Sequence, residues 1–282
     1  LYTALYHCYL QPVDKTGENP KWISTEPNFD DFYAIWDTFR ATHPLFTLLT
    51  PSVQSNMVRS LIDIYRNEGY MPDARSGNDN GRVQGGSNCD ILIADAMVKN
   101  LQGIDYGAGL QAMLKNAEVA PGGDERKEGR GGLADYNSLG YVSSAYERCL
   151  TRTFEYSNCD FAIATVADRL GKQDIANKYY KNASNWQNTW PRNEEGKYWD
   201  KEHFSTLKGG NWGEPTYETF SFELSFYVPH DMKSLIQKCG GEEIFTQRLD
   251  TFFTHKIWDQ RYHIGLFQIA NEPGFLIPSL YN

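Results

Sequence analysis

The feature that most constrains the fold is the helical spacing of apolar residues, which recurs along most of the chain. Thr50-Pro51 is typical of a helix start with proline at its first position, and Gly69 is typical of the end of that helix. Between these two signals the apolar residues follow at helical intervals: Val53, Met57, Leu61, Ile64 and Tyr65. Strand patterns are few and short, so the spacing predicts an all-α fold.

Other segments repeat this helical pattern. The sequence predicts helices over 88–99, over 175–190 and on both sides of Gly240-Gly241. It also predicts a long apolar-rich helix that begins at a capping box at 144–147 and ends at Gly171. Long polar loops rich in glycine and asparagine separate the helices, at 72–87, 121–132 and 193–216. Long loops in a compact domain are usually functional or disordered, so we expect paired helices with a site built at one end.

Composition excludes several classes of protein. The chain has 282 residues and a net charge of −9, from 36 acidic and 27 basic side chains, which argues against a nucleic-acid partner. No apolar run approaches the roughly 18 to 20 residues of a membrane helix. The five cysteines are scattered without a CxxC pair, which argues against structural zinc and leaves any disulfide open.

Three segments combine carboxylates with aromatic or amide groups. The first, 36–40, begins with Trp36-Asp37, where an Asp37–Arg40 structural pair is the alternative interpretation. The second, 217–231, places Glu218 and Glu223 among five aromatic residues. A carboxylic acid in such surroundings tends to have a raised pKa, which suits a general acid, although an amphipathic surface segment would look the same.

The third segment is Asn271-Glu272-Pro273. Adjacent amide and carboxylate oxygens suit a hard cation such as calcium, and a polar turn is the alternative. Paired carboxylates, aromatic residues and the absence of nucleophile motifs together favour glycoside chemistry, because sugars offer apolar faces for stacking and glycosidic cleavage needs two carboxyl groups.

These segments, in this order, resemble glycoside hydrolase family 92, the calcium-dependent exo-acting α-mannosidases. The resemblance runs along nearly the whole chain, through 1–7, 36–40 with His43-Pro44, 71–72, 94–96, 228–231, 271–273 and 280–282. It implies an (α/α)6 barrel in which residues 1–282 form a single domain that is incomplete at its C-terminal end. It also implies that the family's N-terminal β-sandwich and the end of the barrel lie outside this chain, which we then expect to be inactive alone.

The resemblance also implies roles for individual residues. Glu218 occupies the place of the general acid in an inverting mechanism, ten residues before Val228, and Glu223 falls at a polar position near the substrate. Trp36 and Asp37 match the segment that contacts the terminal mannose. Of the aromatic residues, we expect Trp36, Tyr217 and Phe220 to lie near the sugar. The pair Asn271 and Glu272 matches the segment near Ca²⁺, while the general base is expected beyond Asn282.

The implied activity is the calcium-dependent hydrolysis of terminal α-linked mannose from mannose-containing glycans. The implied location is secreted or in the endomembrane lumen, with a signal peptide outside this chain, and the sequence leaves the preferred linkage and the oligomeric state open. Three alternatives remain: a non-catalytic carbohydrate-binding barrel, a different (α/α)6 glycosidase, and a helical interaction scaffold. The scaffold is disfavoured because the one tetratricopeptide-like helix pair, near 170–183, has no second copy.

Overall fold

The structure is a computed structural model that describes residues 1–122, 126–190, 215–219, 221–254, 267 and 272–282. Backbone contacts group the chain into two compact units, one formed by 1–134 with 159–183 and the other by 135–158 with 184–282. The prediction that residues 1–282 form one domain of a larger barrel stays a prediction.

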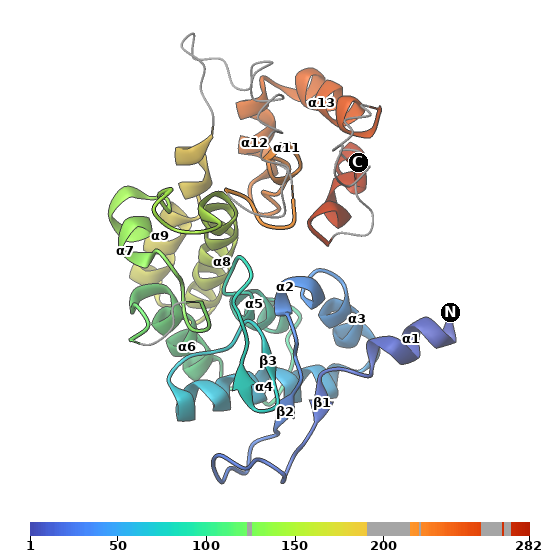
Figure 1. Cartoon of the computed structure of the whole chain (residues 1–282), viewed down its shortest axis with the longest axis vertical. Coiled ribbons are helices and arrows are strands. Elements are labelled where there is room, and N and C mark those ends of the chain that lie inside the picture. Colours follow the sequence, from blue (N-terminus) through green and yellow to red (C-terminus); the bar gives the residue numbers. More distant parts are fainter. Residues whose placement is uncertain (123–125, 191–214, 220, 255–266, 268–271) are drawn as a thin grey trace. The chain divides into compact units, whose positions relative to one another are not determined.

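The first unit is mostly helical (Figure 1). Its helices are α1 (Tyr2–Cys8), α2 (Ile35–Thr38), α3 (Thr42–Leu49), α4 (Pro51–Glu68), α5 (Cys89–Val98), α6 (Tyr106–Glu118), the second half of α8 (Cys149–Arg169) and α9 (Gln173–Asn182). Two short antiparallel pairs join them, β1 (Val13–Asp14) with β2 (Phe29–Asp30) and β3 (Arg75–Ser76) with β4 (Asp79–Asn80). Among the described residues, no helix is both long and apolar enough to cross a membrane.

Helix α4 is the centre of the first unit and packs against α3, α5 and α6. As predicted, it begins at Pro51 and is terminated by Gly69, the residue after its last one, whose φ of +92° is the left-handed conformation that glycine adopts readily. Leu61 and Ile93 are fully buried in the shared core. Helix α6 approaches closely because Gly109 has no side chain: a Cβ there would lie 3.2 Å from Ile93 Cγ2.

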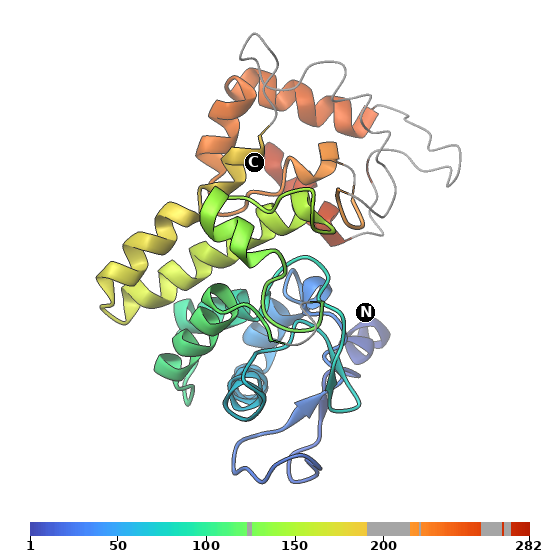
Figure 2. The same cartoon turned by 60° about the vertical axis from the view of Figure 1, so that its left-hand side comes forward.

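The second unit contains α11 (Ser221–Leu224), α12 (Met232–Cys239), α13 (Glu242–Thr254) and two 3₁₀ helices, η1 (Asn185–Thr189) and η3 (Glu272–Tyr281). Helices α7 (Leu133–Leu139) and α8 contribute residues to both units. Figure 2 shows α12 followed directly by α13. Gly240 and Gly241 separate these two helices, with φ angles of +105° and +102°, as the sequence predicts. The core is aromatic: Phe226 packs on Phe222, Phe245 and Phe252.

The structure confirms the all-α prediction and corrects two helix boundaries. The predicted capping box at 144–147 is wrong, because α8 begins only at Cys149, after Arg148 takes a left-handed φ of +55°. The predicted helix over 175–190 is two elements, since α9 ends at Asn182 and η1 follows from Asn185. The polar loop 72–87 contains the β3–β4 hairpin, and most of 193–216 lies outside the described residues.

A buried ionic cluster lies at the start of α5. The guanidinium of Arg130 is 2.6 Å from Asp160 Oδ1 and 3.2 Å from Asp90 Oδ2, and all three side chains are excluded from solvent. Burial raises the pKa of Asp90 to about 7, although Arg130 and a hydrogen bond from Ser87 favour its charged form. A buried ionic cluster of this kind fixes the orientation of the side chains that it joins more than it adds to the stability of the fold, because their desolvation offsets much of the Coulombic attraction.

Candidate active site

Glu218 lies in a turn of the second unit that the structure describes from Pro215 to Thr219. Its φ of +50° is in the left-handed region, which is uncommon for a residue with a Cβ. Such a conformation costs on the order of 1 kcal/mol and persists only where the surroundings hold it. Hydrogen bonds to α8 and to Glu223 hold the turn in this conformation.

The first turn of α8 holds the turn on its N-terminal side. The Leu150 amide donates to the Pro215 carbonyl at 3.0 Å, and the Tyr217 amide donates to Thr151 Oγ1 at 2.9 Å. The Leu150 amide is one of the donors that have no partner inside a helix at its start. The Pro215 carbonyl therefore gives the Leu150 amide a hydrogen-bond acceptor, and the same hydrogen bond fixes the backbone before Glu218.

Glu223 holds the turn on its C-terminal side. The Thr219 hydroxyl donates to Glu223 Oε2 at 2.8 Å, and the Thr216 hydroxyl donates to the Thr219 carbonyl at 2.7 Å. Glu223, on α11, is only 1% exposed. The sequence predicted Glu223 as a substrate contact, and that role stays a prediction. Thr151 and Thr219 were not predicted, because no local pattern distinguishes a threonine that braces this turn, whether from α8 or from within the turn.

The surroundings of Glu218 favour its protonated form. Burial raises the pKa of this half-buried carboxyl group above its ordinary range, and the negative charge of Glu272 adds to that shift. A hydrogen bond from Tyr217 and the positive charge of Arg148 act in the opposite direction. The net result is a carboxylic acid that keeps its proton at higher pH than an ordinary glutamate, which is what a general acid requires.

Glu272 lies close to Glu218. It begins η3, is partly buried, and offers a carboxylate oxygen within 4.8 Å of one from Glu218. Within the residues that the structure describes, Glu272 forms no ion pair. Two acidic groups this close favour a proton on one of them or a cation beside the other. Asn271, the other predicted calcium ligand, lies outside the described residues.

Trp36 and Asp37 lie on α2 in the first unit. Trp36 is fully buried, and the Arg40 guanidinium lies over its ring at 4.7 Å while Arg40 Nε donates to the Trp36 carbonyl at 3.1 Å. Asp37 is partly buried on the same short helix. The predicted contact of both residues with a terminal sugar stays a prediction.

Two other aromatic residues were expected near the sugar. Phe220 lies outside the described residues. Tyr217 is present beside Glu218, and the Arg148 guanidinium lies over its ring at 3.6 Å. One face of the Tyr217 ring is therefore covered by the Arg148 guanidinium, and the predicted contact of Tyr217 with a sugar stays a prediction.

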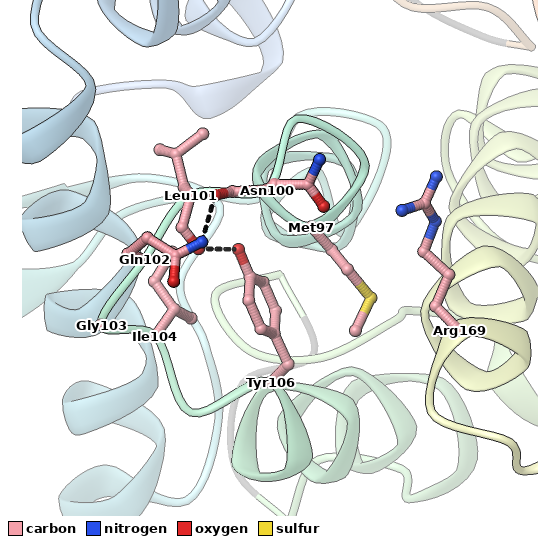
Figure 3. Close-up of a pocket in the computed structure, with 8 residues that line it drawn as sticks. All are labelled: Met97, Asn100, Leu101, Gln102, Gly103, Ile104, Tyr106 and Arg169. Carbon is pink, nitrogen blue, oxygen red and sulfur yellow. Dashed lines mark hydrogen bonds between the residues drawn. The ribbon is translucent and has the colours of Figure 1, made fainter.

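A separate cavity of about 440 Å³ opens in the first unit, beside the segment that joins α5 to α6. Figure 3 shows Tyr106, Met97 and Arg169 around it, with the Tyr106 hydroxyl donating to the Leu101 carbonyl at 2.8 Å. None of the described residues that line it carries a carboxylate. Because glycoside hydrolysis needs a pair of acidic groups, this cavity is not the candidate active site.

Comparison with known proteins agrees with the motifs. Residues 1–282 match the model of the glycosyl hydrolase family 92 catalytic domain. An uncharacterised secreted glycosidase of Arthroderma benhamiae is 32% identical over 321 residues, which cover 100% of this chain and 36% of the relative. The chain therefore spans little more than a third of that protein's length.

Solved structures of the same family are also similar. An inverting mannosidase from Bacteroides thetaiotaomicron matches with a TM-score of 0.76 and 32% identity, over 89% of this chain and 36% of that one. An α-mannosidase from the same bacterium matches with a TM-score of 0.82 and 26% identity, over 99% of this chain and 38% of the other. These matches confirm the predicted fold class, an all-α toroid of helical hairpins. The family match along the full chain, together with the ordered motifs along it, shows that this protein belongs to glycoside hydrolase family 92.

Proposed function

We propose that the protein containing this chain hydrolyses terminal α-linked mannose from glycans or mannosides, with inversion at the anomeric carbon and with Glu218 as general acid. The observation behind this proposal is that Glu218 is held in a strained turn, half-buried, with a raised pKa. Two similar structures add support, one described as an inverting mannosidase and the other as an α-mannosidase in complex with mannoimidazole.

Glu218 would protonate the leaving oxygen while a base activates water on the other side of the sugar ring. In an inverting enzyme the two carboxyl groups stand roughly 6.5–9.5 Å apart, to leave room for that water. Glu272 is too close to Glu218 to be this base, since their oxygens come within 4.8 Å. The base therefore belongs to another residue, which we place beyond Asn282.

Asn271 and Glu272 would hold Ca²⁺, and Trp36 with Asp37 would bind the terminal sugar. The donor set fits a hard cation, because amide and carboxylate oxygens are the ligands that calcium prefers, and the Glu272 carboxylate is close to a second acidic group without an ion-pair partner in the described part of the chain. When bound, calcium would supply coordination for sugar hydroxyls. A location outside the cell is supported by the fungal relative, which is described as secreted.

Glu218→Gln tests the acid role. The amide cannot donate a proton in the same way, so hydrolysis of substrates with poor leaving groups should slow by about 10²-fold or more. Substrates whose leaving group needs no proton should slow far less. The measurement is kcat/KM for a mannobiose and for an activated aryl α-mannoside, and equal slowing of both would move the acid role away from Glu218.

Arg148→Met should raise the pKa of Glu218, because the guanidinium stabilises the charged carboxylate. The deprotonation that ends activity at high pH should then occur at higher pH in the profile of kcat/KM. Arg148→Lys is the matched control, since it keeps the positive charge and should leave the alkaline limb closer to that of the parent enzyme. An alkaline limb that moves to lower pH in Arg148→Met would contradict this assignment.

Calcium removal tests the proposed metal site. Chelation should abolish mannose release and added calcium should restore it, and Glu272→Gln should weaken calcium binding by about tenfold or more in calorimetry. Glu242→Gln, at the exposed start of α13, is the matched control and should bind calcium like the parent enzyme. Unchanged calcium affinity in Glu272→Gln would remove Glu272 from the site.

A further inference from the structure

We infer that Arg130 is a positioning residue for α2, the short helix with Trp36 and Asp37, and acts through a buried chain of polar contacts inside the first unit. This inference rests on the proposed role of Trp36 and Asp37 in binding the terminal sugar. It concerns a residue that no sequence motif indicated. The chain of contacts has three steps.

The first step joins three segments at Arg130. Its Nε donates to Ser87 Oγ at 3.1 Å, its Nη1 to Asp160 Oδ1 at 2.6 Å and its Nη2 to Asp90 Oδ2 at 3.2 Å. Ser87 also donates to Asp90 Oδ2 at 2.6 Å. All these groups are buried, and the planar guanidinium fixes three directions at once, which a lysine ammonium on a flexible stem could not reproduce.

The second step joins the start of α5 to residues 72 and 73. Asp73 Oδ1 accepts one hydrogen bond from the backbone N–H of Asn88 at 3.1 Å and another from its side-chain Nδ2 at 3.0 Å. The adjacent Cys89 thiol donates to the Pro72 carbonyl at 2.7 Å. The residues that follow Ser87 therefore hold both the side chain of Asp73 and the main chain just before it.

The third step joins Asp73 to α2. The Asp73 carbonyl accepts from the Ile35 amide at 2.7 Å, and the Arg75 carbonyl accepts from the Tyr33 amide at 3.2 Å. Ile35 is the first residue of α2, so its amide has no partner within the helix. A helix of four residues does not stabilise itself, and its position therefore depends on contacts such as these.

The chemistry of the cluster also favours a positioning role. Well-packed apolar residues of similar volume would stabilise the unit as well as a buried Arg–Asp–Asp cluster, or better. Arg130 belongs to a glycine-rich loop in which Gly129 and Gly132 both have positive φ angles. The hydrogen bonds of Arg130 fix this loop against the start of α5, and the contacts of Asn88 and Asp73 then fix the segment before α2.

The test uses the intact enzyme with two variants that weaken the cluster to different extents. Ser87→Ala removes two hydrogen bonds without changing charge. Arg130→Met combined with Asp160→Asn removes the guanidinium together with a carboxylate that would otherwise be left buried without its cation. Met113→Ala, in the core of the same unit but outside the chain of contacts, is the control for general destabilisation.

Hydrogen exchange of amides 33–39 is the primary readout. We expect about tenfold faster exchange or more in both cluster variants, with Met113→Ala close to the parent enzyme at a matched loss of Tm. We also expect KM for mannosides to rise by about tenfold, while the alkaline limb that reports Glu218 stays in place. Unchanged exchange in both cluster variants, or equal acceleration in Met113→Ala, would overturn the inference.

Asp37→Asn separates this inference from the proposed function. If Asp37→Asn leaves KM for mannosides unchanged, the proposed binding role of Asp37 fails, and exchange of 33–39 still tests the positioning by Arg130. If Asp37→Asn raises KM while both cluster variants leave KM unchanged, the positioning inference fails and the proposed function stands.

Discussion

The left-handed backbone of Glu218 is the constraint on which the proposed chemistry depends. Held on one side by the first turn of α8 and on the other by the buried Glu223 carboxylate, the turn keeps its acid half-buried and beside Glu272. A relaxed turn would let water reach the carboxyl group and return its pKa toward the ordinary value. The left-handed backbone of Glu218 costs on the order of 1 kcal/mol of folding stability. General acid catalysis typically contributes about 10²–10⁴-fold to the rate of a reaction.

The two units use the same physical device. In each, a short segment that cannot stabilise itself is held by buried polar groups from a longer helix or loop: the Glu218 turn by Thr151 and Glu223, and α2 by Asp73. Hydrogen bonds can hold such a segment in one orientation because their strength depends on the angle between donor and acceptor, whereas apolar contacts do not depend on direction. The apolar cores around Leu61 and Phe226 provide the rigid frame from which these bonds act.

The sequence predicted the helices best where local signals agree. Pro51, Gly69 and the Gly240-Gly241 pair mark helix ends, and the structure confirms them, because capping and glycine conformation are local effects. The capping box at 144–147 failed because the conformation of Arg148 depends on distant contacts, including its stacking on Tyr217. For the site, the ordered motifs indicated the family and its candidate residues. The bracing by Thr151 and Arg130 could not be predicted, since each acts across a large separation in sequence. The contact between Thr219 and Glu223 is local, but no sequence pattern distinguishes it from other threonine–glutamate pairs.

The stereochemistry of the first product tests the central claim most directly. Proton NMR of the anomeric signals during the first minutes of hydrolysis of an aryl α-mannoside by the intact enzyme distinguishes the mechanisms before mutarotation. We expect β-mannose to appear first, because a single displacement by water inverts the anomeric carbon. Initial α-mannose would contradict it, as would the absence of mannose release in the presence of calcium.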